Sequence, residues 1–323
     1  MANIEYENEF YAAQLKDKEE LKGVSSGGVF WALAQSIIAE GGVVYGAEQQ
    51  SIDQIVHSRA ESLEEVKKQR RSKYLQSETV SSYIEARKDL IAGRKVLFSG
   101  TGCQIAGLYL FLGREYDNLC TCEVICHGVP CGLAWRSYKR EKESRVGKKM
   151  VGLIYRNKDK GWSNNQYKIT YSDGTEEFER SDNQLFHAGY LKGLFYRPSC
   201  GNCYFSKMPR VGDLTLADYW KYEGDLLKYG DKGISLVVVN NNKGKKMFDA
   251  SATYMHIEET RSEDAIRSCK HLSHTPNEDE SRAEFMEYLR KRGYYKAAKK
   301  YILHMHGVGI WSRIKAKFGN TEK

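Results

Sequence analysis

The 323-residue sequence has only 4 prolines and no Pro-rich or Gly/Ser-rich stretch of the kind that joins separate domains. Hydrophobic residues make up 41% and charged residues 28%, as in ordinary globular proteins. A chain of this length can build a substantial core or two closely joined lobes. Because no linker is present, we expect one compact body.

Long apolar runs are also missing. The longest aliphatic stretch, 234–239, is interrupted by Ser235 and is far shorter than the roughly 20 residues of a membrane-spanning helix. The first residues, 1–5, lack the basic region followed by an apolar segment that marks a signal peptide. These absences predict a soluble, cytoplasmic protein.

Acidic residues are almost absent from the C-terminal end. Residues 288–323 contain 10 Lys or Arg and one acid, Glu322, and so carry +9, whereas the rest has 40 basic and 41 acidic side chains. The body is therefore nearly neutral, which argues against nucleic acid as a partner. The basic segment can contact an acidic protein surface or a membrane face, or it is simply a solvated helix.

No cysteine precedes Cys103, although the chain has 8 in total. The cytoplasm keeps thiols reduced, so a disulfide framework is not expected and metal, cluster or redox chemistry becomes the leading use. Cys200 and Cys203 have CxxC spacing, which places two thiolates on one tight turn where one metal or cluster can take both.

Helix and strand patterns alternate in the first half of the chain. An apolar helical pattern follows Ser25-Ser26-Gly27-Gly28, whose serines are expected to cap it. Such alternation favours a sheet with parallel strands. The patterns predict helices over 29–38, 63–69, 83–92, 104–112 and 133–142, and strands over 43–47, 52–59 and 119–125, with another strand that begins at 96 and runs into the turn at 99–102.

A glycine-rich turn, Ser99-Gly100-Thr101-Gly102, lies between the strand that begins at 96 and the helical pattern from 104. An arrangement of strand, glycine turn and helix holds phosphates and flavins in many proteins, because the helix N-terminus offers backbone N–H groups. The turn is therefore a candidate flavin site.

The second half of the sequence has a different character. Antiparallel strands are expected over 151–157, 166–171 and 176–179, with Asp173-Gly174 as a hairpin turn, and a buried strand over 234–239. From 264 onward the patterns are mainly helical. We predict an α/β (mixed α+β) fold: a central sheet with a glycine-turn flavin site, added antiparallel strands and a helical C-terminus. Residues 1–260 form the catalytic body, in parts 1–92 and 93–260, and 261–323 a helical basic segment.

Cys103 and Cys126 both follow predicted strands and sit in glycine-containing turns, and strand ends are where sites collect in α/β sheets. A four-iron cluster normally needs four thiolates, which the chain supplies only if the 103–131 region folds against the 200–203 turn. Cys120, Cys122 and Cys269 are expected to be packing residues. Alternatively, the 200–203 pair binds zinc in a ribbon or is a thioredoxin-like dithiol. The dithiol is the weaker of these two alternatives, because no helix clearly follows the pair.

Seven stretches from about Ser25 to about Trp220 resemble, in their order, the coenzyme F420 hydrogenase/dehydrogenase beta-subunit family. They are SSGGVFWALA, GGVVYGA, RRSKYLQS, KVLFSGTGCQIAGL, ICHGVP, the Cys200-x-x-Cys203 turn and DLTLADYW. No single stretch is decisive, but seven in order are specific.

This resemblance implies bound FAD, a [4Fe-4S] cluster, and electron exchange with a deazaflavin, another small-molecule electron carrier or a redox partner protein. It places Ser25, Ser26, Gly27 and Gly28 and the turn Ser99, Gly100, Thr101 and Gly102 against the flavin or its pyrophosphate, with Ser72, Lys73 and Tyr74 adding contacts. It makes Cys126, Cys200 and Cys203 cluster ligands, with Cys103 as the fourth.

The chain departs from the family pattern in two places. Relatives usually have Pro where Gly102 stands, and glycine is expected to loosen the turn that carries Cys103. Many relatives also have an N-terminal ferredoxin-like stretch that is absent here, so the internal electron chain is short. Genes for bacterial members with this layout often lie beside polysaccharide genes, which suggests a role in polysaccharide biosynthesis. The resemblance therefore does not imply that F420 itself is the electron carrier.

Individual roles follow as hypotheses. Lys73 is a candidate for stabilising negative charge on a reduced flavin or a substrate phosphate, or else a solvated surface lysine. His127 is either a proton donor or, as we favour, a residue that holds the cluster turn. Tyr74 and Trp220 stack on a ring system or pack in the core. Two alternatives to the flavin and iron–sulfur oxidoreductase remain: a flavin reductase with a zinc staple, and a non-catalytic protein that binds partners through its basic tail.

Overall fold

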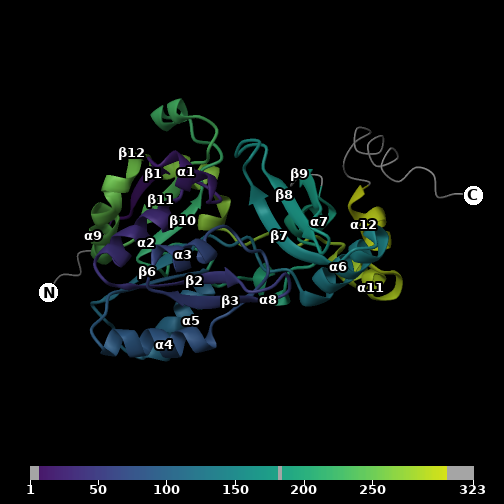
Figure 1. Cartoon of the computed structure of the whole chain (residues 1–323), viewed down its shortest axis with the longest axis horizontal. Helices are drawn as coiled ribbons and strands as arrows, with labels where there is room; N and C mark the ends of the chain where they lie inside the picture. Colours follow the sequence, from purple (N-terminus) through teal and green to yellow (C-terminus); the bar gives the residue numbers. More distant parts are fainter. Residues whose placement is uncertain (1–6, 181–183, 304–323) are drawn as a thin grey trace, which may run out of the picture. The chain divides into compact units, whose positions relative to one another are not determined.

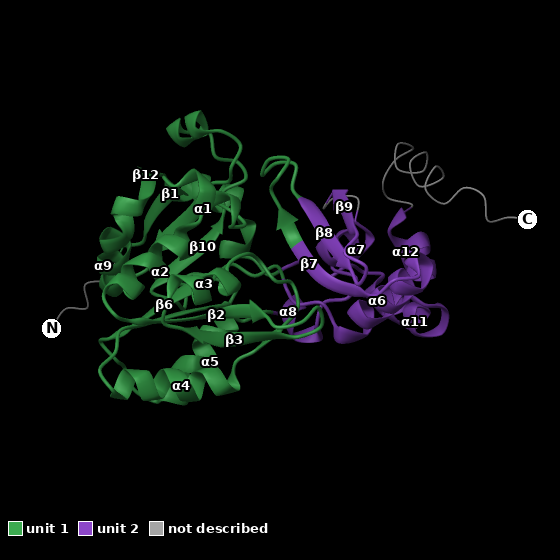
Figure 2. Ribbon diagram, in the orientation of Figure 1, with its two compact units in different colours: residues 1–127, 155–165, 203–275 green, residues 128–154, 166–202, 276–323 purple. Residues whose placement is uncertain are grey.

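The computed structural model describes residues 7–180 and 184–303, and these form two compact units (Figure 2). Unit 1 comprises the chain up to residue 127 with 155–165 and 203–275, and unit 2 comprises 128–154, 166–202 and the chain from 276. This differs from the single body that the lack of linkers suggested. The chain passes between units within turns and inside a strand, so no linker composition marks the boundary. The functional division at residue 260 remains a prediction.

Unit 1 is built on a nine-stranded sheet in the order β12-β1-β11-β10-β6-β5-β2-β3-β4 (Figure 1). Its strands are β1 (Glu9–Leu15), β2 (Val43–Gln49), β3 (Ile55–Ala60), β4 (Ser77–Glu78), β5 (Val96–Gly100), β6 (Leu119–Val124), β10 (Leu214–Asp218), β11 (Ser235–Val239) and β12 (Met255–Glu259).

The four neighbouring strands at the centre of this sheet, β2, β5, β6 and β10, are parallel to one another. This confirms the parallel sheet expected from the alternating patterns. On either side the pairing becomes antiparallel: β11 pairs with β10, β1 with β11, β12 with β1, and β3 with β2. The sheet is therefore mixed, as the predicted fold class requires.

Helices cover both faces of the sheet in unit 1 (Figure 1). Alternate residues of each buried strand serve opposite faces, as strand geometry dictates. In β5, Leu97 joins the core under α2, whereas Val96 and Phe98 join the core under α4 and α5. The helices of unit 1 are α1 (Lys18–Lys22), α2 (Val29–Ala39), α3 (Leu63–Gln69), α4 (Val80–Ile91), α5 (Gly102–Leu112), α9 (Asn242–Ser251) and α10 (Ser262–Ser268), with short 3₁₀ turns at Asp225–Tyr229, Ala252–Tyr254 and Lys270–Leu272.

Unit 2 contains a three-stranded sheet of β7 (Met150–Asn157), β8 (Gln166–Tyr171) and β9 (Glu176–Arg180). β8 and β9 are antiparallel and are joined at Asp173-Gly174, where Gly174 has the positive φ of 81° that this hairpin needs. Aromatic rings of Trp135, Phe186 and Tyr294 form part of the core. The helices are α6 (Gly132–Val146), α7 (Leu185–Leu191), α8 (Pro198–Gly201), α11 (Arg282–Arg292) and α12 (Tyr294–Tyr301).

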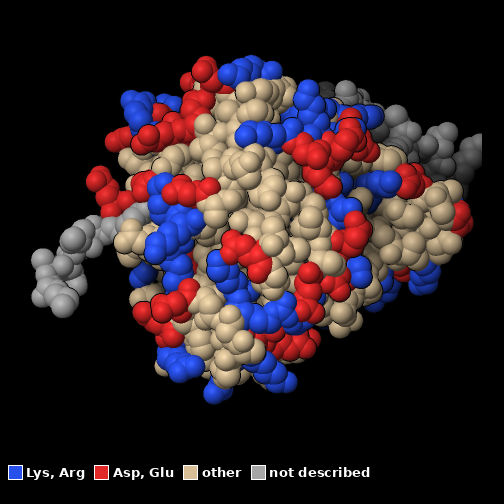
Figure 3. Space-filling model, turned by 60° about the vertical axis from the view of Figure 1, so that its left-hand side comes forward, with Lys and Arg blue, Asp and Glu red and all other residues tan. Residues whose placement is uncertain are grey.

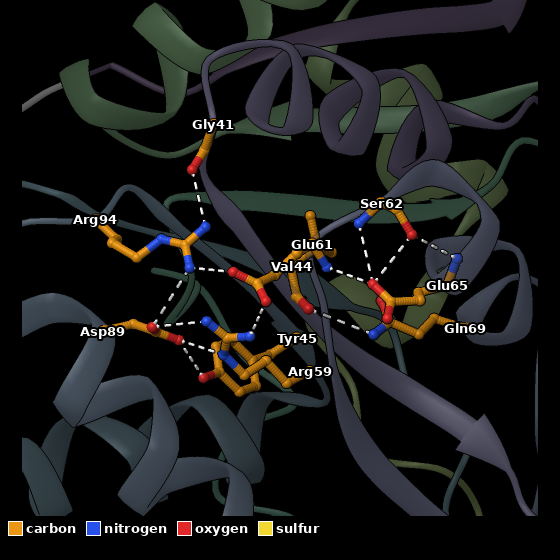
Figure 4. A network of polar contacts seen from close by, with 10 residues as sticks. All are labelled: Gly41, Val44, Tyr45, Arg59, Glu61, Ser62, Glu65, Gln69, Asp89 and Arg94. Carbon is orange, nitrogen blue, oxygen red and sulfur yellow. Dashed lines mark hydrogen bonds and ion pairs between the residues drawn. The ribbon is translucent and has the colours of Figure 1, made fainter.

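A polar network fixes α4 to the sheet of unit 1 (Figure 4). The Asp89 carboxylate on α4 accepts hydrogen bonds from Arg59 Nε at 2.8 Å and Arg59 Nη2 at 2.9 Å, and from the Tyr45 hydroxyl at 2.6 Å. Arg59 and Arg94 also pair with Glu61. Such a bidentate pair is stronger than an ordinary surface ion pair because its geometry is fixed.

Charges of both signs are interspersed on the face shown in Figure 3, in keeping with the neutral body. The basic C-terminal segment begins in α11 and α12, which carry Arg290, Lys291, Arg292, Lys296, Lys299 and Lys300; its remaining Lys and Arg lie outside the described residues. Within 7–180 and 184–303, no helix has the length and apolar character needed to cross a bilayer.

Candidate functional site

The predicted site segments of unit 1 meet at one edge of the large sheet. Parallel strands end at a common edge, and β2, β5, β6 and β10 are parallel, so the residues that follow them lie on the same side. β11 runs the other way and begins there, with Ser235 opposite Asp218 of β10. We call this side the carboxyl edge. The segments around it are 25–28, 72–74, 99–103, 126–127 and 218–220.

The turn before α2 is tied to the carboxyl edge by its serine and glycine residues. The Ser26 hydroxyl donates to the carbonyl of Ile234 at 2.8 Å, and the Gly27 amide donates to the Ser235 hydroxyl at 3.0 Å. The residue that caps α2 is Gly28, with φ of 86°, and no side chain caps this helix. The expectation that the serines cap the helix is therefore wrong: their hydroxyls bind neighbouring segments instead.

Close packing explains why glycines occupy this turn. A Cβ at Gly27 would overlap the carbonyl oxygen of Ala13 and lie 2.6 Å from the amide nitrogen of Ser235. A Cβ at Gly28 would overlap the Leu15 side chain, and its positive φ also favours glycine. The backbone at the start of α2 thus lies directly on β1 and β11, and a helix N-terminus is a place where proteins commonly bind anions.

The structure brings two of the predicted cofactor segments together. The Ser72 amide donates to the Ser25 hydroxyl at 2.8 Å, across 47 residues of sequence. The residue before it, Arg71, has a positive φ of 73°, and its guanidinium donates to the carbonyls of Lys22 at 3.2 Å and Arg156 at 3.5 Å. The 70–74 segment is therefore held against the turn that begins α2.

Lys73 is neither a surface lysine nor a side chain directed at open space. Its ammonium donates to the carbonyls of Arg70 at 2.7 Å, Gln69 at 2.9 Å and Lys68 at 3.3 Å, at the end of α3, and to that of Ala47 on β2 at 2.6 Å. Burial lowers the pKa of Lys73 to about 7. A cation at a helix C-terminus is favourable because it meets the negative end of the helix dipole. The contacts make Lys73 an anchor between α3 and the sheet.

The aromatic candidates have aromatic and cationic neighbours. Tyr74 meets Tyr155 edge to face at 5.1 Å between ring centroids, and Arg156 is a charged neighbour of Tyr74. Trp220, just past β10, stacks on Trp162 with ring centroids 4.1 Å apart and planes 5° from parallel. Trp220 is 49% exposed, so it is a surface ring beside the site and not a core residue.

Sequence reasoning missed two buried cations that reach the site from residues 155–165. Arg156 forms an ion pair with Asp218, lies 5.0 Å from the Trp220 ring centroid, and has a buried Nη2 with no hydrogen-bond partner among the described residues. Lys158 donates to the carbonyls of Ser26 at 2.9 Å and Lys232 at 2.6 Å. Burial and the nearby Arg156 lower the pKa of Lys158 to about 7.

A signal for these cations was present in the sequence. Arg156 and Lys158 are two residues apart at the end of a predicted strand, and this spacing puts both side chains on one side of an extended chain. Trp162 follows shortly after them, and its buried Nε1 has no hydrogen-bond partner among the described residues.

The second glycine turn connects β5 to α5 as predicted. His57 Nε2 donates to the Ser99 carbonyl at 2.8 Å, and burial lowers the pKa of His57 to about 4, so this imidazole is neutral at pH 7. The Gln104 side chain accepts from the Thr101 amide at 3.0 Å and so caps the start of α5. Cys103 is exposed, and its Sγ lies 3.2 Å from Thr101 Oγ1.

Gly102 is closely packed, contrary to the expectation that glycine loosens this turn. A Cβ there would lie 2.5 Å from Glu123 Oε1 and 3.0 Å from the Cβ of Phe205. Glu123 lies near the end of β6, shortly before Cys126, and Phe205 follows Cys203 by two residues. The segments that carry Cys103, Cys126 and Cys203 therefore approach one another at this point.

The three cysteines that were expected to be packing residues have the surroundings of such residues. Cys120 and Cys122 are buried in β6, which confirms their expected role in the core. Cys269 packs against another part of the core, and burial raises its pKa to about 11. Of the four predicted ligands, Cys200 lies in α8 of unit 2, whereas the other three belong to unit 1.

No group of three or more His, Cys, Asp or Glu within 7–180 and 184–303 is arranged to hold a metal ion. This finding concerns single ions. In a four-iron cluster each thiolate binds a different iron atom, so the four sulfurs need not surround one centre.

His127 follows Cys126 and contacts a second histidine. Its Nδ1 lies 2.5 Å from Nε2 of His271, with the rings edge to face and their centroids 4.4 Å apart. Burial lowers the pKa of His271. The pair joins the end of β6 to the 3₁₀ turn at Lys270–Leu272, which supports the turn-holding role that we favoured for His127.

A mixed sheet with glycine turns and polar side chains at the carboxyl edge defines an α/β protein, a class whose ligand sites commonly lie at this edge. Residues 93–264, more than half of the chain, match the family described as the C terminus of the coenzyme F420 hydrogenase/dehydrogenase beta subunit. The chain belongs to this family of oxidoreductase proteins, as the ordered motifs predicted.

A chain of the F420-reducing NiFe hydrogenase complex from Methanosarcina barkeri has a similar fold. The two are 19% identical with a TM-score of 0.52, and the alignment covers 93% of this chain and 94% of that chain. No curated protein matches the sequence. The central sheet, the added antiparallel sheet and the helical C-terminal region thus form the fold of a hydrogenase beta subunit.

Proposed function

We propose that this protein is a flavin- and iron–sulfur-dependent oxidoreductase that passes electrons between FAD, a [4Fe-4S] cluster and a redox partner protein or small-molecule electron carrier. The observation that carries the proposal is the hydrogen bond between Ser72 and Ser25, which joins two predicted flavin segments beside the buried Arg156.

The residues around this hydrogen bond suit the pyrophosphate of FAD. Buried cations need anionic partners, and here the three cations Arg71, Arg156 and Lys158 lie near the acids Asp218 and Asp159. The unpartnered Nη2 of Arg156 is a donor of the kind that a phosphate oxygen satisfies. The start of α2 adds backbone N–H groups and the positive end of a helix dipole.

The cysteines of unit 1 suit an iron–sulfur cluster. Cys103, Cys126 and Cys203 are borne on segments that approach one another at Gly102, and none of the three is buried in the core. We propose that they are ligands together with Cys200, whose CxxC spacing from Cys203 is set by the sequence. Thiolates are the usual ligands of such clusters.

When bound, FAD supplies hydride chemistry and the cluster supplies single-electron transfer. The chain itself binds and orients. Lys73 and Lys158 fix the backbone at the two sides of the flavin segments through their bonds to carbonyl oxygens. Trp220 presents a half-exposed ring to a planar partner, and Arg156 beside it compensates negative charge.

Anaerobic purification followed by quantitation of flavin, iron and sulfide tests the proposal. We expect one FAD, four iron and four sulfide per chain, with a broad absorbance near ~400 nm. Zinc in place of iron would support the zinc-stapled flavin reductase, and protein that retains no FAD after reconstitution would overturn the flavoprotein.

The flavin site is tested separately by Arg156→Met, because loss of a charged hydrogen bond worth roughly 1.5–3 kcal/mol weakens FAD binding about tenfold or more. The matched control is Lys243→Met. Like Lys158, Lys243 donates to a backbone carbonyl, that of Tyr116 at 2.9 Å, but it does so at the opposite edge of the sheet. Equal FAD affinity in the two variants would contradict the assignment.

A further inference from the structure

We infer that the buried ion pair between Glu123 and Arg210 is a positioning device that holds the three cysteine-bearing segments of unit 1 in register for one cluster. This inference rests on the proposed cluster and adds two residues that contribute no ligand. It concerns the arrangement of the chain before any iron is bound.

Glu123 is the central member of the device. It lies in β6, three residues before Cys126, and its side chain is 0% exposed. Its carboxylate pairs with Arg210 and accepts hydrogen bonds from the amides of Val211 at 3.2 Å and Gly212 at 3.3 Å. A buried carboxylate is costly unless it is paired in this way. The end of β6 is thereby tied to the segment that follows Cys203.

Arg210 extends these contacts to a third stretch of chain. Its side chain is 3% exposed, and its Nη1 donates to the carbonyls of Lys207 at 3.3 Å and Leu272 at 3.2 Å. Leu272 follows His271, which contacts His127 beside Cys126. The Cys126 turn is therefore held twice, once through Glu123 and once through the two histidines.

Gly102 connects Cys103 to the same pair. Glu123 Oε1 occupies the space where a side chain at Gly102 would begin, 2.5 Å from an ideal Cβ, and Phe205 closes the other side at 3.0 Å. Proline would be favourable at the first position of a helix, yet its ring also needs this space. Gly102, which departs from the family pattern, therefore leaves the space that the Glu123 carboxylate occupies.

A second, partly buried ion pair lies in unit 1 away from the cysteines and serves as a comparison. Arg59 and Asp89 hold α4 against β3, and their other polar partners are Tyr45, Glu61 and Arg94, which belong to no cysteine-bearing segment (Figure 4). Both pairs are expected to stabilise unit 1 when intact, because breaking a buried pair leaves an uncompensated charge. Only the Glu123–Arg210 pair is expected to affect iron.

The test uses anaerobically reconstituted full-length protein and the variants Glu123→Gln and Arg210→Met, with Asp89→Asn as the matched control. We expect Asp89→Asn to lower the melting temperature but keep four iron per chain and the electron paramagnetic resonance (EPR) spectrum of the reduced cluster. Glu123→Gln, which keeps the shape of the side chain, should lose at least half of the iron or shift the EPR signal while FAD remains bound.

The outcomes separate this inference from the proposed function. Wild-type protein that takes up no iron would overturn the cluster itself. A wild-type cluster with full iron, an unchanged EPR spectrum and an unchanged midpoint potential in both Glu123→Gln and Arg210→Met would overturn the inference alone.

If a single variant of Glu123 or Arg210 fails to fold, a double variant still tests whether the pair affects iron binding. The double variant Glu123→Gln/Arg210→Met removes both charges and so leaves no unpaired buried ion. It should fold and still lose iron, and a full cluster in it would overturn the inference. Gly102→Ala alone should also lose iron. In a protein that already carries Glu123→Ala, Gly102→Ala should reduce the iron content by a smaller factor, because the new methyl group takes the space that the Glu123 carboxylate has left.

Discussion

The carboxyl edge of unit 1 has two ends that are built in different ways. At one end, the turn at Ser25–Gly28 is bound to β1 and β11 by backbone and hydroxyl hydrogen bonds and is surrounded by buried cations. At the other, the segments around Cys103, Cys126 and Cys203 meet at a buried carboxylate and a histidine pair. Cations suit an anionic cofactor and thiols suit iron, so each end has its own chemistry.

A closely packed glycine lies at each end, Gly27 at the cationic end and Gly102 at the cysteine end. Replacing each by alanine gives the strongest test of the comparison. Gly27→Ala places a Cβ against the carbonyl of Ala13, so we expect unit 1 to lose about 3 kcal/mol of unfolding free energy. The variant should bind FAD at least tenfold more weakly and keep its iron, whereas Gly102→Ala should lose iron and keep FAD. Urea unfolding together with flavin and iron quantitation measures both effects.

Gly113→Ala is the control for these glycine variants. Gly113 has a φ of 67°, but a Cβ there meets nothing within 4 Å. It should cost only about 1 kcal/mol from backbone strain and leave both cofactors in place. If Gly27→Ala and Gly102→Ala instead lost FAD and iron together, the two ends would form one cooperative site and the comparison would fail.

The next effect is a pH dependence that comes from two buried lysines, Lys73 and Lys158. Burial lowers the pKa of Lys73 and of Lys158 to about 7, whereas in the unfolded chain both remain near the ordinary value of about 10.5. Between these values the unfolded chain holds more protons than the folded one, so the contribution of these lysines to stability rises as pH increases from about 7 to about 10.5. Below about pH 7 both lysines are charged in the folded protein, so the full cost of burying these two charges is subtracted from the free energy of unfolding.

Affinity for FAD should move in the opposite direction, because deprotonation of Lys158 removes a positive charge from the anion site. We expect FAD binding to weaken between pH 7 and 9 while the iron content stays constant. Lys158→Met should flatten the binding profile and reduce the slope of the stability profile, to which Lys73 still contributes, and Lys243→Met should change neither. A wild-type affinity for FAD that is constant over this range would contradict the role of Lys158.

Contiguous patterns in the sequence predicted much of this arrangement. The strand, glycine turn and helix at 96–112 and the three strands of unit 2 needed only local information, since apolar spacing and turn residues determine them. The ordered motifs placed Ser25–Gly28 and Ser72–Tyr74 in one site, and the Ser72–Ser25 hydrogen bond joins these segments.

Long-range pairing explains what the sequence did not predict. Lys158 reaches the Ser26 carbonyl across 132 residues, and Arg210 reaches Glu123 across 87. The spacing of Arg156 and Lys158 places both on one side of a predicted strand, but no local pattern shows that these charges or Arg210 are buried. The serines before α2 were misassigned for the same reason: their hydroxyls bind β11 and the 70–74 segment, which become neighbours only in the folded chain.

The smallest effect concerns the stacked indoles beside the cationic end. Trp220 is 49% exposed and packs on Trp162 at 4.1 Å, so Trp220→Ala removes one stacked pair and little buried area. We expect a loss of about 1 kcal/mol in unfolding free energy and a few-fold weaker binding of FAD or of the electron carrier. Trp220→Phe keeps an aromatic face and should restore most of the affinity. Fluorescence titration measures the affinity. The cysteine segments do not contact this ring in our proposal, so the iron content should be equal in the wild type, Trp220→Ala and Trp220→Phe. An iron loss in Trp220→Ala would show that the two ends depend on each other.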